Sequence, residues 1–382
     1  MKQNMVNLSC IARVIAGQSP PSTTYNEEGE GLPFYQGKTD FGADFPTPRK
    51  WCSKPKKTAE PGDILISVRA PVGPTNLANE QCCIGRGLGA IRCDLALTDT
   101  AYILHYLKYF EPRLAAQGNG STFSAIKRED LEKVEIPLPP LPEQKRIAAI
   151  LDKADAIRRK RKEAIDLSDE FLRSVFLDMF GNFEKPSSPK IKLSEMEGLS
   201  LQNGLSPSSR GLVSAEVLTL SAITKGRFDG SQRKSGIFAS VPEGKTLSQE
   251  LFLICRGNGN KNLVGIGVFP TENDNGCLYP DTMISMEFKN TPWSRHFFEF
   301  IWNSPLVRRQ IIKAAKTTNG TFKINQSAVA NITIPIPDES LQNRFSEINK
   351  CVEAMRKKQV AQNKESELLF NSIQQRAFRG DL

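Results

Sequence analysis

The chain has 382 residues, of which 39% are hydrophobic and 24% charged, with a formal net charge of +9. At this length two domains are expected, because single hydrophobic cores rarely grow so large. The positive charge permits an anionic partner such as nucleic acid without requiring one. No run of 18 apolar residues occurs, which argues against a membrane-spanning helix.

The eight cysteines form no C-x-x-C pair, and no histidine lies at zinc-finger spacing from them. We therefore expect free buried thiols, with no disulfide framework and no metal site. The segment 1–17 lacks the long apolar stretch of a secretory signal. These features predict a cytoplasmic protein.

Residues 1–140 are predicted to form short strands and loops, with a strand at 62–69 and a short helix at 101–110. The run IPLPPLP follows at 136–142. Proline at nearly every second position is incompatible with a regular helix or a central strand. This run is therefore expected to be an extended strap, either polyproline-like or at a sheet edge.

Two long helices are predicted, at 142–181 and 338–382, each after a strand-and-loop region. In the first helix, no proline occurs between Pro142 and Gly181, and Gly181 is the first glycine. Pro142 suits the start of a helix and Gly181 suits its end. Apolar residues recur in both at close to a seven-residue spacing, which is typical of a coiled coil. The expected packing residues are Ile147, Ile150, Ala154, Ile157, Phe171 and Val175, and in the second helix Phe345, Ile348, Val352, Met355, Leu369 and Ile373.

The same pattern occurs twice, since residues 119–180 and 319–378 follow one template at a spacing of 198 residues. We therefore predict an α+β protein with two globular domains, 1–141 and 182–337, built from mixed strands and short helices. The two long helices would separate them as an antiparallel coiled coil with a pseudo-two-fold axis. A two-fold protein suits a two-fold partner, and duplex DNA is the commonest one.

Motifs for catalysis are missing. There is no phosphate-binding G-x-x-x-x-G-K-[ST] loop, no H-E-x-x-H, and no Asn- or Asp-Pro-Pro-aromatic motif of an amino-methyltransferase. His105 and His296 are the only histidines, and both suit packing or surface roles better than catalysis. No catalytic residue is predicted.

Loops rich in glycine, arginine and asparagine occur in both halves. The strands 64–69 and 251–256 each end in an arginine followed by a turn, at what we expect to be equivalent positions of the two halves. Arginine binds guanine edges or phosphates, and asparagine binds adenine. The alternative is a solvated turn with an isolated arginine. The candidate DNA-binding residues are Gln36, Lys38, Arg69, Arg86, Ser121, Thr122 and Lys127, and in the second half Arg256, Asn258, Asn260, Lys261, Asn319, Thr321 and Lys323.

The basic run 158–162 lies on the first predicted long helix. Such a run is usually a solvated face. It would also suit contact with DNA or with an acidic partner.

Residues 119–162 and the closing segment 375–382 resemble the specificity subunits of type I restriction–modification systems. The resemblance implies a non-catalytic subunit that recognises double-stranded DNA at a bipartite site. Its two target-recognition domains would each read one half-site. The helices would act as spacers and dock two methylation subunits. S-adenosylmethionine, ATP and magnesium are expected on partner subunits, which include motor and endonuclease subunits.

Two other hypotheses remain. In the first, the chain is a coiled-coil adaptor that holds protein partners without reading DNA sequence. In the second, it is a nuclease or methyltransferase that acts alone. The second copy of the repeat also departs from the family pattern, since residues 337–344 differ from the PPLPEQKR of the first copy.

Overall fold

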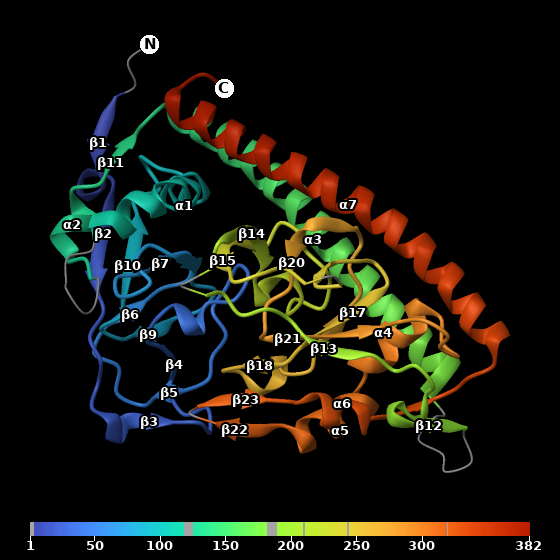
Figure 1. Ribbon diagram of the computed structural model, residues 1–382. Coiled ribbons are helices and arrows are strands. Elements are labelled where there is room, and N and C mark those ends of the chain that lie inside the picture. Colours follow the sequence, from blue (N-terminus) through green and yellow to red (C-terminus); the bar gives the residue numbers. More distant parts are fainter. Residues whose placement is uncertain (1–3, 118–124, 182–188, 209–210, 243, 319) are drawn as a thin grey trace. The chain divides into compact units, whose positions relative to one another are not determined.

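The computed structural model describes residues 4–117, 125–181, 189–208, 211–242, 244–318 and 320–382. The chain divides into two compact units: unit 1 is Met1–Ala164 with Gln359–Leu382, and unit 2 is Ile165–Lys358. Each unit contains part of both long helices, α3 (Leu141–Phe180) and α7 (Glu339–Arg379) (Figure 1). Within the described ranges, no helix combines the length and the apolar character needed to cross a bilayer.

The described residues of unit 1 form three sheets and, besides the long helices, two α-helices. The two-stranded sheet pairs β1 (Met5–Asn7) with β11 (Glu135–Pro137). The four-stranded sheet has the order β2 (Ala12–Ala16), β10 (Leu88–Cys93), β7 (Ile64–Ser67), β8 (Thr75–Leu77). The five-stranded sheet has the order β3 (Tyr25–Asn26), β5 (Trp51–Cys52), β4 (Leu32–Tyr35), β9 (Cys82–Ile84), β6 (Thr58–Ala59). The helices are α1 (Thr100–Gln117) and α2 (Arg128–Glu132).

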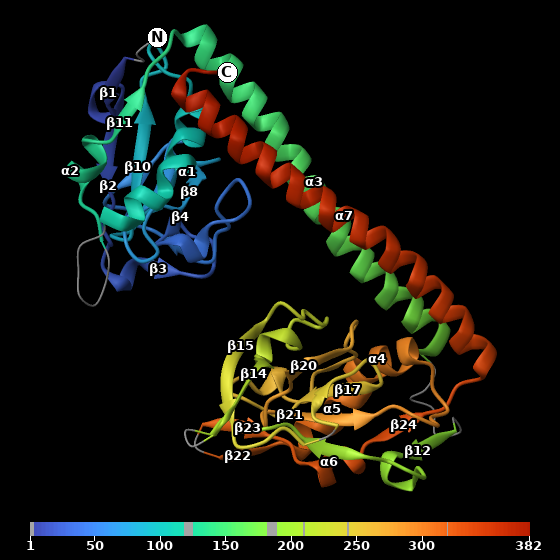
Figure 2. The same cartoon turned by 45° about the horizontal axis from the view of Figure 1, so that its top comes forward.

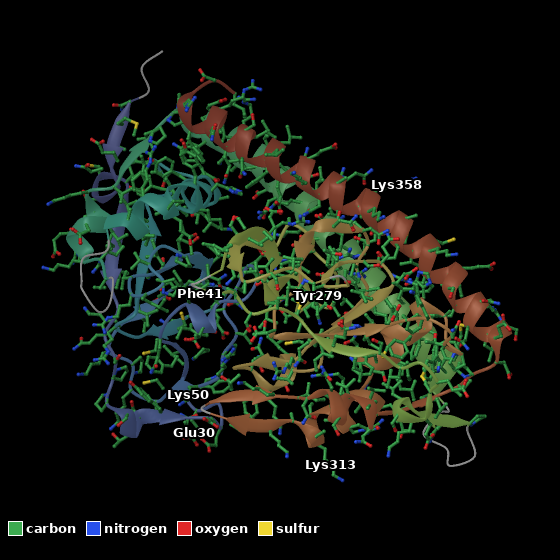
Figure 3. All side chains as sticks on the ribbon, in the orientation of Figure 1. Glu30, Phe41, Lys50, Tyr279, Lys313 and Lys358 are labelled. Carbon is green, nitrogen blue, oxygen red and sulfur yellow. The ribbon has the colours of Figure 1, made fainter. Side chains whose placement is uncertain are left out.

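Unit 2 repeats the first two sheets and adds two others. The repeated two-stranded sheet pairs β12 (Lys190–Lys192) with β24 (Thr333–Pro335). The repeated four-stranded sheet has the order β13 (Leu201–Asn203), β21 (Met283–Glu287), β17 (Leu251–Cys255), β19 (Gly267–Val268). A second four-stranded sheet has the order β15 (Arg233–Phe238), β14 (Val213–Leu218), β20 (Asp274–Leu278), β16 (Thr246–Leu247). A three-stranded sheet has the order β18 (Gly257–Asn258), β23 (Thr321–Lys323), β22 (Lys316–Thr318). The helices are α4 (Arg295–Asn303), α5 (Pro305–Ala314) and α6 (Gln326–Ala330). The side chain of Tyr279, which directly follows β20, is buried in unit 2 (Figure 3).

The duplication extends well beyond the repeat visible in the sequence. The N–H of Leu8 donates to the carbonyl of Val134 at 2.8 Å, and that of Leu193 to Ile332 at 3.0 Å. Likewise the N–H of Gly17 donates to Leu88 at 2.9 Å, as Gly204 does to Met283 at 3.1 Å. Both units therefore share the strands and contacts of these first two sheets, although the sequence similarity begins only near residue 119.

The first part of the predicted strap is extended at a sheet edge, since Ile136 and Pro137 lie in β11, but its last residues, Leu141 and Pro142, already belong to α3. β11 pairs with β1 alone, which tolerates prolines that have no N–H to donate. An aromatic side chain holds each copy: the hydroxyl of Tyr102 donates to the carbonyl of Pro137 at 2.8 Å, and Nε1 of Trp293 donates to Pro335 at 2.7 Å. Different residues thus perform the same task in the two units.

A buried glutamine fastens the start of each long helix. Oε1 of Gln144 accepts the N–H of Asp99 at 3.0 Å, while its Nε2 donates to the carbonyls of Leu97 and Pro139 at 3.0 and 2.9 Å. In unit 2, Oε1 of Gln342 accepts the N–H of Ser294 at 2.7 Å and Nε2 donates to two proline carbonyls. The carboxamide fits because it donates and accepts at once.

The predicted antiparallel packing of the two long helices is confirmed. In unit 1 the start of α3 shares a core with the end of α7, where Ile147 and Leu151 lie in the same cluster as Phe378. In unit 2 the end of α3 meets the start of α7, with the rings of Phe176 and Phe345 5.3 Å apart. Figures 1 and 2 show α3 in green beside α7 in red.

The buried seam of these helices differs from the predicted one. Ile147, Phe345 and Val352 are buried, and Ala154, Val175 and Ile373 pack partly buried against the cores, whereas Ile150 and Ile348 are half-buried. Ile157, Phe171, Met355 and Leu369 are 53, 52, 48 and 61% exposed, so they lie outside the seam, contrary to the prediction.

The error is one of phase. Leu172 and Phe370, each one residue beyond a predicted position, are buried instead. One residue turns the helix by about 100°, which is enough to move a side chain out of the interface. The seam was hard to locate because several of its positions are polar, including Asp155, Asn349 and Gln374.

Truncation of either glutamine is expected to destabilise the protein. Gln144→Ala or Gln342→Ala leaves one buried N–H and two carbonyls without their partner, at roughly 1–3 kcal/mol for each orphaned group. We expect a loss of about 2 kcal/mol or more in the free energy of unfolding, measured by urea denaturation. Gln375→Ala, at an exposed position of α7, is the matched control. An equal, small loss in all three variants would contradict the anchoring role.

Glu299 is expected to make stability depend on pH. Burial raises its pKa to about 7, against opposing effects of its hydrogen bond from the Phe269 N–H and of Arg227 and Arg295. Because the raised pKa favours the protonated form in the folded state, ionisation destabilises the fold as pH rises from about 4.5 through 7. Glu299→Gln should therefore be more stable than wild type by about 1–2 kcal/mol at pH 8.

That advantage should shrink toward zero at pH 5, as read from thermal melts at both pH values. Glu347→Gln, which changes an exposed carboxylate on α7, should show no such pH-dependent gain. A Glu299→Gln variant less stable than wild type at pH 8 would show that the ionised carboxylate is favourable.

Candidate nucleic-acid interface

Four cationic side chains of unit 1 line a single pocket of about 250 Å³. Arg69 follows β7, Arg86 lies in the turn between β9 and β10, and Lys127 and Arg128 stand at the start of α2. The remaining walls are mostly small or apolar: Val14, Ala16, Gly17, Val68, Leu88, Gly89, Ala125, Ile126 and Leu131. Three of the predicted DNA-binding residues, Arg69, Arg86 and Lys127, are thus brought together from distant parts of the sequence.

Glycines allow the turn that carries Arg86 to pack tightly. A Cβ on Gly87 would lie 2.2 Å from the carbonyl oxygen of Gln36, and one on Gly17 would lie 2.2 Å from that of Gly85. Larger residues at these positions would push the strands apart. The backbone of Gln36 therefore lies against the Arg86 turn, and the Gln36 side chain is exposed.

Lys38 occupies a different setting. It begins a short turn at Lys38–Asp40, and its charge opposes the burial that raises the pKa of Glu111 on α1. Its positive charge is thus partly offset by a nearby carboxylate.

The cations of the pocket differ in their partners. Arg128 pairs with Glu132 at 2.6 Å along α2. Across the described residues, no carboxylate pairs with the charged groups of Arg69, Arg86 or Lys127, and all three side chains are exposed. Asp130 uses its carboxylate to accept the backbone N–H of Lys127 at 2.7 Å. Three positive charges are therefore available to an anion.

In unit 2 the candidate residues gather on the sheet β18-β23-β22. Asn258 on β18 pairs with Phe322, next to Thr321 and Lys323 on β23. The ammonium group of Lys261 lies 6.0 Å from the ring centre of Phe322. The side chain of Lys323 lies over Gly257, whose Cβ would approach its Cγ to 3.3 Å. Asn258 and Lys323 thus lie on this sheet, and Lys261, which is also exposed, lies close to it.

Part of the hydrogen-bonding capacity of unit 2 is used within its own loop. Oδ1 of Asn258 accepts the N–H of Asn260 at 2.9 Å, and Oδ1 of Asn260 accepts that of Asn262 at 3.0 Å. These are turn-stabilising contacts of the kind asparagine commonly makes. The guanidinium of Arg256 donates to the carbonyl of Asp281 at 3.0 Å. Arg256 is therefore fixed in place and only half-buried.

The two strand-end arginines are not structurally equivalent, contrary to the prediction. Ile126 and Ile324 occupy matching positions of the repeat. The N–H of Ile126 donates to the carbonyl of Val68 at 3.0 Å, whereas the N–H of Ile324 donates to the carbonyl of Arg256 at 2.9 Å. Arg256 thus corresponds to Val68, and Arg69 corresponds to Gly257. Because successive side chains of an extended strand point to opposite sides, the arginines project differently.

Other basic residues have structural roles or were not identified from the sequence. Arg158 and Arg159 of the basic run pair with Asp155, and Arg159 also pairs with Asp44. Arg128 was not predicted, although its position next to Lys127 was a usable signal. Ser121, Thr122 and Asn319 lie outside the described residues.

Both histidines are at least partly buried. Nε2 of His105 lies 2.8 Å from Oδ1 of Asp152 and joins α1 to α3, and burial lowers the pKa of His105. Burial also lowers the pKa of His296. In the part of the chain that the structure describes, no three His, Cys, Asp or Glu side chains form a group that would hold a metal ion.

Residues 4–167 match the type I restriction modification DNA specificity domain. Over 168 residues the chain is 46% identical to the putative specificity subunit of the type I restriction enzyme MjaX of Methanocaldococcus jannaschii. The aligned region covers 43% of this chain and 40% of that protein. It is 25% identical over 361 residues to the specificity subunit of the type I restriction enzyme EcoKI of Escherichia coli K12, covering 86% of this chain and 76% of that protein.

The fold is similar along nearly the whole chain to the crystal structure of a type I restriction–modification S subunit from M. genitalium. The TM-score is 0.59 at 15% sequence identity, covering 99% of this chain and 96% of that one. The chain is therefore similar to type I restriction–modification specificity subunits, most closely over residues 4–167.

Proposed function

We propose that this chain is the sequence-reading subunit of a type I restriction–modification complex, in which each unit contacts one half of a split DNA site. The observation that carries the proposal is the set of unpaired cations in the unit 1 pocket, which lies at the ends of strands in a DNA specificity domain. Cations held on rigid strand ends suit the phosphate contacts that position a protein on DNA.

The two units share a backbone plan but carry different side chains at the loops. Unit 1 offers Gln36, Arg69 and Arg86, whereas unit 2 offers Asn258, Lys261 and Lys323. Different donors and acceptors recognise different base edges. The proposed site is therefore bipartite with two dissimilar halves, and non-specific bases between them.

The proposed subunit performs no chemistry of its own. Methylation with S-adenosylmethionine, and translocation and cleavage with ATP and magnesium, are assigned to partner subunits, and we expect the complex to act in the cytoplasm. The alternative function, a coiled-coil adaptor that ignores DNA sequence, shares the partner-binding role and differs only in its DNA binding.

The long helices have surfaces suited to partner docking. Large apolar side chains are exposed on them in both units: Ile157, Val360, Leu368 and Leu369 in unit 1, and Leu167, Phe171, Leu177 and Met355 in unit 2. Leu167 and Phe171 are 54 and 52% exposed and lie one helical turn apart, on the same face. Exposed apolar groups of this kind favour contact with another protein.

Single substitutions should change one half-site at a time. Asn258→Ala removes a base-reading side chain from unit 2 only, and Gln36→Ala does the same in unit 1. A lost base contact costs about 1–3 kcal/mol of discrimination. Methylome sequencing of cells that carry each variant and its methylation partner should therefore show relaxed specificity in one half-site, and in the opposite half-sites for the two variants.

If both half-sites changed together in either variant, the division of labour between units would be wrong. Methylation without any sequence preference in the wild type would instead support the adaptor alternative.

Charged substitutions on the helices should weaken assembly. Phe171→Glu and Leu369→Glu place a carboxylate in the proposed docking surface, and because both side chains are largely exposed, the fold should be unaffected. We expect less co-purification with the methylation subunit, measured by size-exclusion chromatography. Leu212→Glu changes a 94% exposed side chain outside the helices and is the control. Assembly equal to that of the control would exclude this docking surface.

A further inference from the structure

We propose that the pocket of unit 1 binds a backbone phosphate of DNA and that unit 2 has no counterpart of this site, so the two units contribute unequally to affinity. This inference rests on the proposed function, since it takes DNA as the ligand. It goes beyond that proposal in assigning a further salt-dependent phosphate contact to only one half of a duplicated protein.

The chemistry of the pocket suits a phosphodiester. Arg69, Arg86, Lys127 and Arg128 all line it, and none of the acidic side chains in the described part of the chain does. Of the nearby carboxylates on α2, Glu132 pairs with Arg128 and Asp130 accepts the N–H of Lys127, which leaves Glu129 exposed on the same short helix. The volume of about 250 Å³ accommodates a phosphate group with its flanking sugar atoms.

The duplicated backbone shows which residue of unit 2 corresponds to Arg86. The N–H groups of Gly17 and Gln18 donate to Leu88 and Ile84, and in unit 2 those of Gly204 and Leu205 donate to Met283 and Tyr279. Leu88 and Ile84 thus match Met283 and Tyr279. The two residues before Leu88 in the chain match the two before Met283, so Arg86 corresponds to Asp281, and a positive charge becomes negative.

The other three cations are also replaced. The pair Arg69 with Ala125 in unit 1 matches Gly257 with Lys323 in unit 2, so the counterpart of Arg69 has no side chain. The match of Ile126 to Ile324 makes Asn325 and Gln326 the counterparts of Lys127 and Arg128. None of the four positions keeps its charge.

Unit 2 has cations in this region, but at other positions. Arg256 and Lys323 correspond to Val68 and Ala125 of unit 1, and the guanidinium of Arg256 is bonded to the Asp281 carbonyl. At the matched positions unit 1 therefore has four cations and no acid, whereas unit 2 has two cations and one acid.

Space differs as well as charge. Gly89 pairs with Ala16 across the sheet, as Ile284 pairs with Asn203. Gly89 lines the pocket and leaves its floor open, whereas Ile284 carries a fully buried side chain at the matched position. Unit 2 thus lacks both the four cations of the unit 1 pocket and its open floor.

The salt dependence of DNA binding measures this difference. Each phosphate neutralised on duplex DNA contributes about −0.9 to the slope of log K against log salt concentration. We would measure this slope for the full chain assembled with its methylation subunits. The triple variant Arg69→Gln, Arg86→Gln, Lys127→Gln should make the slope shallower by about two to three.

The control removes the same charge elsewhere in unit 1. Lys145→Gln, Lys153→Gln and Lys364→Gln alter exposed lysines of the long helices, and the slope should stay within error of the wild type. Asp281→Arg restores a cation to unit 2 and should make the slope steeper by about one. This gain is informative even if the triple variant folds poorly.

Three outcomes would overturn the inference. The first is a triple variant whose slope falls no further than that of the control, and the second is an Asp281→Arg variant with an unchanged slope. The third is calorimetric binding of inorganic phosphate that the triple variant abolishes while its DNA slope is unchanged, which would indicate a free-anion site.

The proposed function fails separately. If the wild-type complex binds all duplexes alike, sequence reading is refuted whatever the slopes show. If the complex prefers one duplex but the slopes contradict the expectation, only the phosphate site is refuted.

Discussion

The largest hydrophobic core of each unit takes residues from both long helices. The core of unit 1 includes Phe370, Ala377 and Phe378 from the last helix, and the core of unit 2 includes Phe176 and Phe180 from the first. The rings of Tyr106 and Phe378 meet edge to face at 5.1 Å, and those of Phe180 and Phe345 at 5.7 Å. Such aromatic contacts are favourable beyond the area that they bury. Antiparallel helices are thus a condition for both cores.

Polar contacts make the same junctions specific. The carboxamides of Gln144 and Gln342 tie each helix start to the loop before α1 or α4, where apolar packing alone would tolerate a shift. Arg227 adds a second link in unit 2, since it pairs with Asp169 of α3 and Glu353 of α7. Buried polar groups must find their partners, so these contacts favour one register over its neighbours.

The long helices could be predicted from the sequence, but the positions of individual side chains could not be predicted to within one residue. The long helices were expected at 142–181 and 338–382 and occur at Leu141–Phe180 and Glu339–Arg379, because proline and glycine mark helix ends strongly. The seam was misplaced because buried polar positions carry no hydrophobic signal. The equivalence of Arg69 and Arg256 was off by one residue, which only the hydrogen bonds from Ile126 and Ile324 reveal. Arg69, Arg86 and Lys127 were each named, but their meeting in one pocket depends on strand order.

The shared cores also affect when the protein can fold. Chains emerge from the ribosome N-terminus first, and domains usually fold in that order. Here the first unit needs side chains near residue 378, so its core stays open until more than two hundred further residues have been made. Contacts so distant in sequence also slow folding in general. Nascent chains should thus expose the apolar surface around Ile147 and Tyr102 throughout most of translation, and chaperones that bind such surface would assist their synthesis.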